Sequence, residues 1–433
     1  MKFTAKLSGL LSGLQPVIAV SQVGVKSEYP DEGKVSLKVT SKGLLAETHN
    51  GNVAISSLMF DQAEVDFVYG GSDGHVTVDS KDLASTLSSF DKGEILNVTL
   101  NGTELSFVPQ SDPEKLQTLP SEVREIEMPM VATAFSKETK INKAALIEAT
   151  DRTLFAIGFE KFREAFFYWK LILSPKKMRI VCGDGGRFPI YDIEGDNLSD
   201  ATSETVYLIY KDQNPALIKV LKMVESDSMT IKEYNRNDDA SQVGDQFVIV
   251  MGSISLVLIG HNPSIQWPDE SQFTARRNSF KFVTRAADWK KEMSGILATY
   301  NEAVRSINKV HTTLLTFDST KNIITLKAEN AMRSVRKVKM LDSEIDQDQP
   351  DTVEFRVEST VLRDALEQAD GNVQMELFPG TKPENGEIMR CTKPMVCKYF
   401  AADKVGPGPF ERINSAAGTK EQYLIAFGAY NKK

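Results

Sequence analysis

Two structural patterns recur together three times along this chain of 433 residues. One is an amphipathic helix with apolar residues at positions i, i+3, i+4 and i+7, and the other is a pair of alternating strands around a short turn. The helical stripes begin at Leu83, Leu217 and Leu362, and the strand pairs begin at Leu37, Leu171 and Leu315. Both patterns return after roughly 140 residues, a period that indicates three repeated domains, because solenoid units span only about 20–50 residues.

Each copy also opens with a helical segment, which sets the order of elements within a domain. These segments are Leu7 to Val20, residues 142–156, and a stripe from Trp289 to Val304. In the first copy Asn101-Gly102 lies between two alternating runs, a strong signal for a tight hairpin. Every copy thus has the order helix, hairpin, further strands, helix, hairpin. This order predicts α+β domains in which antiparallel sheets carry the helices on one face.

Chain length agrees with a division into three domains, since a typical domain has about 150 residues. We predict domains at residues 1–128, 129–275 and 276–433. The third contains an insertion near residues 380–420, which includes Gly406-Pro407-Gly408-Pro409.

The overall charge excludes a protein that binds nucleic acid through a positive net charge. The chain has 51 lysines and arginines against 59 aspartates and glutamates, a formal net charge of −8, which leaves room only for a local basic surface. Three irregularly spaced cysteines (Cys182, Cys391 and Cys397) do not form a disulfide framework, which favours a reducing compartment such as the cytoplasm. No apolar run reaches the ~18 residues of a membrane span, and the N-terminus is an amphipathic helix rather than a signal peptide.

Three segments of the second copy resemble one protein family in their order and spacing. Residues 146–157 (LIEATDRTLFAI), followed by Arg163, resemble the first helix and next strand of that family's middle domain. The loop Gly183-Asp184-Gly185-Gly186-Arg187-Phe188 is similar to the family's threonine-Asp-Gly-His-Arg-leucine loop, and Trp267-Pro268-Asp269 resembles its aromatic-Pro-Asp segment. The family is the bacterial-type DNA sliding clamp, the beta subunit of the replicative DNA polymerase.

The chain also departs from the family pattern. Gly186 stands where the family often has histidine, and Gly183 where threonine is usual. The family's apolar-Met-Pro-Met ending corresponds here to residues 423–428 (YLIAFG). These departures are typical of a divergent member, such as one encoded by a phage.

The resemblance implies a ring of three-domain chains, closed head-to-tail by a second copy around duplex DNA. The helices would form the inner wall and the sheets the outer wall. Such a ring would hold DNA without reading its sequence and would tether the replicative polymerase. A separate ATP-dependent clamp loader would open it.

A basic inner wall requires cations on the helix faces opposite the apolar stripes. At about 100° per residue, Lys219 and Lys222 lie about 200° and 140° from Leu217, away from the core. Asp364 and Glu367, on the outer face of the third copy's second helix, do not fit a uniformly basic wall. The full set of predicted DNA-facing cations is Lys81, Lys143, Arg152, Lys219, Lys222, Lys291 and Arg305.

The resemblance implies a second site, a groove between the second and third domains that binds short peptides of polymerases and loader subunits. Apolar walls with a few polar anchors suit a peptide of alternating side chains. Phe166 has an equally good interpretation as an ordinary core residue, since most large aromatic side chains are buried. By position, the implied groove residues are Phe166, Gly185, Arg187, Phe188, Pro268, Phe273, Asn330, Leu424, Ala426 and Phe427.

The motifs do not favour an enzyme. The four histidines lack metal-ligand spacing, and residues 183–186 lack the P-loop pattern, so a tight turn is the better interpretation there. We expect no catalytic residue, metal or cofactor. Two alternatives stay open: a non-enzymatic three-domain DNA-binding or assembly protein that does not close into a ring, and a hydrolase using Asp184.

Overall fold

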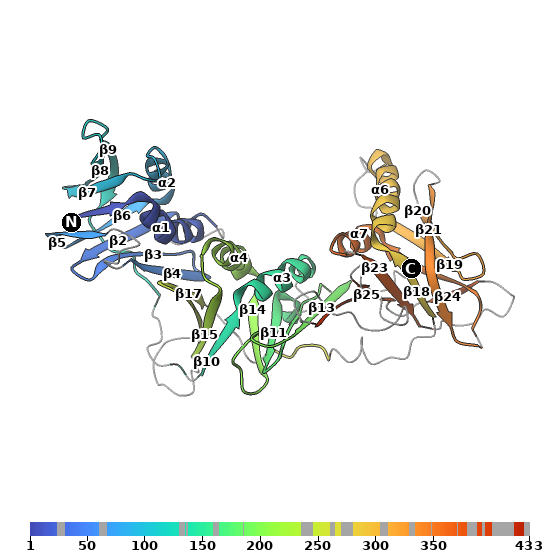
Figure 1. Cartoon of the computed structure of the whole chain (residues 1–433). Helices are drawn as coiled ribbons and strands as arrows, with labels where there is room; N and C mark the ends of the chain where they lie inside the picture. The colour runs from blue at the N-terminus through green and yellow to red at the C-terminus, as the bar shows by residue number, and fades with distance from the viewer. Residues whose placement is uncertain are drawn as a thin grey trace. The chain divides into compact units, whose positions relative to one another are not determined.

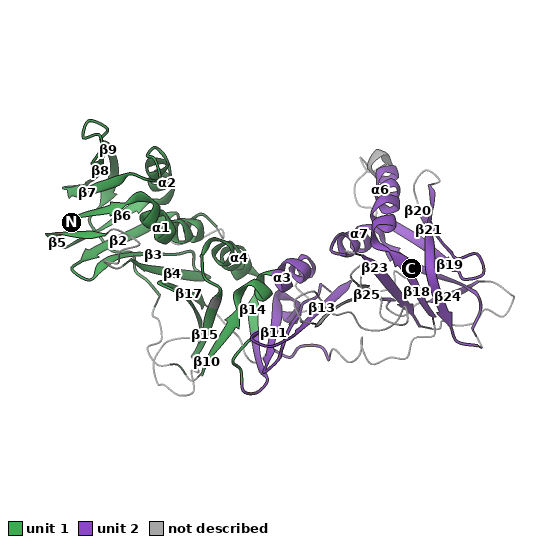
Figure 2. Cartoon of the chain, viewed as in Figure 1, with its two compact units in different colours: residues 1–147, 199–201, 208–264 green, residues 148–198, 202–207, 265–433 purple. Residues whose placement is uncertain are grey.

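The computed structural model describes the chain as two compact units (Figure 2). Unit 1 comprises residues 1–147, 199–201 and 208–264, and unit 2 comprises residues 148–198, 202–207 and 265–433. The described residues are 1–23, 31–59, 67–129, 135, 137–158, 164–184, 186–234, 246–259, 265–269, 280–303, 311–328, 334–347, 349–369, 371–378, 388–391, 395–400 and 420–427.

Unit 1 is an antiparallel sheet system with its helices on one face (Figure 1). The strand order is β10-β15-β16-β17-β4-β3-β2-β6-β9-β8-β7-β1-β5. The strands are β1 (Lys2–Lys6), β2 (Lys34–Thr40), β3 (Gly43–His49), β4 (Val53–Met59), β5 (Val68–Ser72), β6 (Gly74–Asp79), β7 (Ile95–Asn101), β8 (Glu104–Pro109), β9 (Gln117–Glu122), β10 (Lys137–Asn142), β15 (Ser228–Tyr234), β16 (Gln246–Met251) and β17 (Ile254–Ile259). The helices are α1 (Leu7–Gln22), α2 (Ser80–Ser88) and α4 (Asn214–Met223), the last preceded by the 3-10 turn η3 (Lys211–Gln213).

Unit 2 repeats this architecture with the strand order β14-β11-β12-β13-β26-β25-β23-β18-β21-β20-β19-β22-β24. The strands are β11 (Tyr168–Ser174), β12 (Lys177–Val181), β13 (Arg187–Glu194), β18 (Phe280–Arg285), β19 (Thr312–Asp318), β20 (Ile323–Ala328), β21 (Val335–Ile345), β22 (Thr352–Glu358), β23 (Asn372–Leu377), β24 (Met389–Cys391), β25 (Met395–Phe400) and β26 (Lys420–Phe427). The helices are α6 (Ala286–Ala303), α7 (Ser359–Glu367) and the 3-10 turns η1 (Leu154–Ala156) and η2 (Glu164–Phe167). Helix α3 (Lys143–Thr153) and strand β14 (Thr205–Tyr210) each contain the point where the chain passes between the units.

The predicted repeat is confirmed element by element. Each copy contains a strand that leads into an opening helix (α1, α3 or α6), then a hairpin, a second helix (α2, α4 or α7) and further strands. The stripes that begin at Leu83, Leu217 and Leu362 are buried, as their period requires. The hairpin predicted at Asn101-Gly102 joins β7 to β8, with Asn101 paired to Glu104 and Gly102 at a φ of 62°. The predicted antiparallel α+β class is therefore correct.

A backbone hydrogen bond closes each repeat at the same place. The first N–H of the opening helix donates to a carbonyl in the segment that follows the second helix. The three bonds are Leu7 N to Glu94 O (2.9 Å), Lys143 N to Asp227 O (3.2 Å) and Ala286 N to Gly371 O (2.8 Å). Because a helix start has unpaired N–H groups, this bond ties the two ends of each repeat together.

Sheet joints link consecutive repeats in the same way in both units. In unit 1, β4 follows the hairpin of the first repeat and pairs with β17, the last strand of the second, with Ile55 opposite Leu256. In unit 2, β13 takes the place of β4 and pairs with β26, the last strand of the third repeat, with Ile190 opposite Leu424. The middle repeat contributes β17 to the joint in unit 1 and β13 to the joint in unit 2. The boundary between the two compact units therefore runs through the middle repeat. The domain boundaries at 128 and 275 remain a prediction.

Close packing of the first helix on the sheet depends on a glycine. Helix α1 contacts β3 and β4, and it lies beside α2 and α4 (Figure 1). A Cβ atom at Gly13 would lie 2.5 Å from the sulfur of Met59 on β4, so only glycine permits this approach without a shift. The core beneath α1 includes Leu10, Leu14 and Val17, all nearly inaccessible to solvent.

Candidate nucleic-acid interface and peptide site

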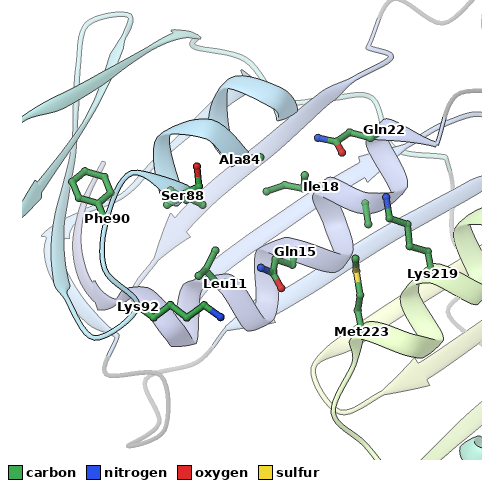
Figure 3. A pocket seen from close by; sticks show the side chains of 12 residues that line it. Leu11, Gln15, Ile18, Gln22, Ala84, Ser88, Phe90, Lys92, Lys219 and Met223 are labelled. Carbon is green, nitrogen blue, oxygen red and sulfur yellow. The ribbon is translucent and has the colours of Figure 1, made fainter.

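Three helices of unit 1 form a surface with a cavity of about 420 Å³ (Figure 3). The floor is apolar, with contributions from α1, from α2 and from the segment after α2. Two lysines reach the cavity from elements on different sides of α1. The lining residues are Leu11, Gln15, Ile18, Ala19, Gln22, Ala84, Leu87, Ser88, Phe90, Lys92, Lys219 and Met223.

The exposed face of α1 is polar but carries no charge. The helix sequence LSGLLSGLQPVIAVSQ contains no ionisable side chain, and its exposed residues are Ser8, Ser12, Gln15 and Gln22. Positive charge beside this face must therefore come from neighbouring elements. Lys219 on α4 is among the predicted DNA-facing residues.

The predicted cations have two different environments. Lys81 on α2, Lys222 on α4 and Lys291 on α6 are exposed, and Lys219 is half-buried. These positions agree with helix faces opposite the buried stripes. Arg305 lies outside the described residues.

The other two predicted cations bind carbonyl groups at helix ends. The ammonium group of Lys143 donates to the carbonyl of Val224, which follows α4. In unit 2, Nη1 of Arg152 donates to the carbonyl of Gln368 at the end of α7 (3.0 Å), and its Nε lies 3.3 Å from Glu148. Both side chains thus compensate the negative end of a helix dipole, a structural role that sequence periodicity did not indicate.

The acidic residues on α7 are neutralised by arginines. One oxygen of Asp364 lies 2.5 Å from Arg363, and the other lies 2.8 Å from Nη1 of Arg187. Glu367 is 3.6 Å from Arg363. These carboxylates raise the pKa of the Arg363 guanidinium, chiefly through its hydrogen bond to Asp364. The two acidic side chains are therefore less repulsive to phosphate than the sequence alone implied.

An aromatic cluster in unit 2 brings together several residues of the implied peptide groove. Phe166 and Phe188 have ring centroids 6.3 Å apart in an edge-to-face arrangement, and Trp267 lies 6.0 Å from each. Phe166 is 6% exposed and Phe188 3% exposed, so both belong to a core cluster with Val181, Ile190, Phe378 and Val396. Trp267 is half-buried, and its indole N–H has no hydrogen-bond partner among the described residues.

Asp184, between β12 and β13, accepts hydrogen bonds from Gly186 and from the start of β13. One carboxylate oxygen accepts from the backbone N–H groups of Gly186 (2.9 Å) and Arg187 (2.7 Å). The other accepts from Nε of Arg187 at 2.8 Å. Because both oxygens accept hydrogen bonds from Gly186 or Arg187, the structure gives no support to a hydrolase in which Asp184 acts on a substrate.

Glycine at position 183 is required by the aromatic cluster. A Cβ atom there would lie 2.7 Å from Cδ2 of Phe188 and 3.2 Å from Cε1 of Phe166. Threonine, which is usual in the family at this place, does not fit beside the two phenyl rings. The departure at Gly183 is thus coupled to the large side chains at positions 166 and 188.

The remaining groove residues are described only in part. Pro268 is half-buried next to Trp267. The backbones of Leu424, Ala426 and Phe427 lie on β26, opposite Ile190, Phe188 and Arg187 respectively. Gly185, Phe273 and Asn330 lie outside the described residues. The structure therefore gathers Phe166, Arg187, Phe188, Pro268 and the β26 backbone in unit 2, and the assignment of these residues as a groove remains a prediction.

Sequence reasoning missed two residues of these surfaces. Lys92 lines the α1 cavity from the segment after α2, where no helical periodicity marks it. Trp267 belongs to the aromatic-Pro-Asp segment noted in the sequence, and it packs against the aromatic cluster of Phe166 and Phe188. Its size and its position before proline were the available signals.

Metal and membrane sites receive no support from the described part of the chain. Among the residues that the structure describes, no group of three or more His, Cys, Asp or Glu side chains is arranged to hold a metal ion. No helix among those residues is long and apolar enough to cross a membrane. The three cysteines, Cys182, Cys391 and Cys397, are buried.

The chain has the sliding-clamp fold. It is similar to solved beta subunits of DNA polymerase III over 100% of both chains. Examples are those of Streptococcus pneumoniae (12% identity, TM-score 0.75), Pseudomonas aeruginosa (15%, 0.73) and Thermotoga maritima (14%, 0.73). No protein-family model and no curated protein matches the sequence. The resemblance expected from the sequence is therefore confirmed in the fold, while the identity is low.

Proposed function

We propose that the chain is a sliding clamp that closes into a ring with a second copy of itself and encircles duplex DNA. In the cytoplasm it would tether a replicative polymerase without reading the DNA sequence. It would perform no chemistry of its own, and an ATP-dependent loader would open the ring. Solved structures with the same fold are of DNA polymerase III beta subunits and sliding clamps, which supports this proposal.

The observation that carries the proposal is the repeated sheet joint. The strand after the hairpin pairs with the last strand of the next repeat in both units, as β4 with β17 and β13 with β26. Two equivalent strands take part in neither joint. They are β21, which follows the hairpin of the third repeat, and β9, the last strand of the first repeat. A β21–β9 joint between two copies would use the same geometry, and a head-to-tail joint that closes on itself makes a ring.

The exposed surfaces of these strands are suited to such a joint. Among the strands that the structure describes, residues 335–339 of β21 pair with β20 on one side only, and Val335 is 53% exposed. Near β9, Leu116 is 52% exposed. The β21 segment also carries the exposed cations Lys337 and Lys339. Exposed apolar residues on a strand edge are typical of an edge that pairs with another chain.

Retention on circular DNA tests the proposal. After loading on a nicked circle, the protein should remain bound at high salt and should leave when the circle is linearised, because only topology holds it there. Its solution mass should be about twice the 48.0 kDa of one chain. Equal, salt-sensitive binding to circular and linear DNA by a monomer would instead support the alternative of a DNA-binding protein that does not close.

A further inference from the structure

We propose that Arg124 positions strand β9 for ring closure by holding the end of this strand against β2. The guanidinium group lies between two carboxylates, that of Glu122, the last residue of β9, and that of Asp31, in the turn before β2. These residues, together with Lys34 on β2, are called the β9 anchor. The inference rests on the proposed ring and specifies what keeps its closing edge ready to pair.

Strand β9 is held in place by few apolar contacts of its own (Figure 1). Leu119 is the one buried side chain among its six residues. Pro120 has no N–H group to donate to a neighbouring strand. Among the described strands, residues 117–120 pair with β8, and only Ser121 and Glu122 pair with β6. A segment with so few buried contacts opens easily, so β9 needs a further contact at its end.

Arg124 supplies this contact with two sides of its guanidinium group. Nη2 lies 2.5 Å from Oδ1 of Asp31, and Nε lies 2.6 Å from Oε2 of Glu122. The other oxygen of Glu122 accepts a hydrogen bond from Nζ of Lys34 at 2.7 Å. The backbone is held as well, because the Arg124 carbonyl accepts a hydrogen bond from the Thr77 hydroxyl on β6 at 2.7 Å. The end of β9 is therefore bonded to β2, to the turn before β2 and to β6.

The burial of Asp31 gives the anchor its strength. The Asp31 side chain is 9% exposed, whereas those of Arg124 and Glu122 are 39% and 52% exposed. Exposed ion pairs contribute little to stability, but a nearly buried carboxylate that loses its cation keeps an uncompensated charge. Hydrogen bonds from Lys34 and Arg124 also lower the pKa of Glu122 to about 2, so this carboxylate is ionised at neutral pH.

An ordered β9 favours closure because a disordered strand must lose conformational entropy when it pairs. That cost is subtracted from the free energy of association. The opposite edge has a different support. Residues 335–339 of β21 continue into a segment of the same strand that pairs with β18 as far as Ile345. Strand β21 is thus ordered by its own sheet, whereas β9 depends on Arg124.

The test combines the dissociation constant of the ring with hydrogen exchange of the β9 amides, both measured on the full chain. Arg124→Gln should raise the dissociation constant about tenfold, the effect of losing hydrogen bonds between charged groups. The amides of residues 117–122 should exchange faster than in wild type, while those of the β16–β17 hairpin keep their rates. Arg124→Lys, which keeps the charge but lacks the planar fork, should give an intermediate dissociation constant.

The matched control is Lys232→Gln, which also removes one cation from an ion pair of unit 1. Nζ of Lys232, on β15, lies 2.9 Å from Glu138, on β10. This variant should keep the wild-type dissociation constant and the wild-type exchange rates at β9, because neither strand contributes to the proposed closure.

Failure of the anchor is distinguishable from failure of the clamp proposal. If wild type is a dimer that stays on circular DNA, the clamp proposal stands. An unchanged dissociation constant or unchanged β9 exchange in Arg124→Gln, or an equal loss in Lys232→Gln, would then overturn the anchor alone. A wild-type chain that is monomeric at every concentration would overturn the ring, and with it the role of Arg124 in closure.

Discussion

Individual residues at the aromatic cluster show how one large side chain constrains its neighbours. Phe166 and Phe188 occupy the space that a Cβ atom at Gly183 would need. Gly158 is constrained in the same way, since its Cβ would lie 2.8 Å from Cβ of Phe166 and 3.0 Å from that residue's carbonyl oxygen. The contact of a Gly158 Cβ with this carbonyl oxygen cannot be relieved by rotating a side chain. A Cβ at Gly183 would also lie 3.2 Å from the carbonyl oxygen of Arg187, in addition to the two phenyl rings.

The substitution Gly183→Thr should destabilise the protein by about 1–3 kcal/mol, the usual cost of overpacking a filled core. Urea denaturation of the two proteins measures this difference. Gly186→Ala is the control, because its nearest contact is Asp184 Oδ1 at 3.6 Å, an ordinary van der Waals distance. A Gly183→Thr variant as stable as wild type would mean that the rings move aside freely.

Trp267 offers a cleaner probe of the peptide site than Phe188, because it is half-buried whereas Phe188 is 3% exposed. Trp267→Ala should weaken binding of a polymerase-derived peptide by about tenfold or more, as an aromatic anchor carries at least about 1–2 kcal/mol. Titration with a peptide that carries a glutamine and two or three apolar residues measures the effect. Trp267→Phe should retain most of the affinity. Equal affinity for Trp267→Ala and wild type would place the site elsewhere.

At the scale of elements, basic side chains of α3 stabilise the ends of other helices. A helix ends with several carbonyls that lack intrahelical donors. Lys143 donates to the carbonyl after α4, and Arg152 donates to the carbonyl of Gln368 after α7. Helical periodicity placed both residues on an outer face, and that placement did not distinguish a DNA contact from a contact with a helix end.

The substitution Arg152→Met separates these two roles. It removes the 3.0 Å hydrogen bond to Gln368 and the cation–π contact over the ring of Tyr191 at 5.8 Å. We expect a loss of about 1–2 kcal/mol in the free energy of unfolding, with no change in the salt slope of DNA binding. Denaturation and DNA titration give the two measurements. A slope lower by about one, with unchanged stability, would show that Arg152 contacts phosphate.

At the scale of the whole molecule, two sheet joints of one kind already exist within the chain, and ring closure requires a third. The joint β4–β17 has five antiparallel residue pairs and the joint β13–β26 has eight. Among the described strands, residues 117–120 of β9 pair with β8 and residues 335–339 of β21 pair with β20, each on one side. A β9–β21 joint would satisfy the N–H and C=O groups on their other sides.

A charge near β9 should therefore prevent ring closure. Leu116→Arg is expected to shift the solution mass toward the 48.0 kDa of one chain and to abolish retention on circular DNA. Folding should survive, because Leu116 is 52% exposed. Val68→Arg on β5 is the matched control, as Val68 is 58% exposed on a different edge. If Val68→Arg alone breaks the assembly, closure uses β5 instead.

The sequence by itself determined the local elements and their repetition. Apolar period, turn residues and spacing predicted the three hairpins, the six principal helices and the antiparallel α+β class, all of which the structure contains. Such patterns depend on residues within a few turns or one hairpin of each other, so a single sequence displays them directly. Arg187 and Phe188, which the loop motif marked in the sequence, are the first two residues of β13, and their role in a peptide groove remains a prediction.

Only the tertiary structure decided which elements contact each other and which charged side chains already bind other groups of the protein. The partner of β13 is a strand more than 200 residues away, and the sequence alone does not distinguish one edge strand from another. Arg187 binds Asp364, Arg152 binds the end of α7, and Lys92 joins Lys219 beside α1. Each of these contacts depends on long-range packing, and periodicity within one element carries no information about it.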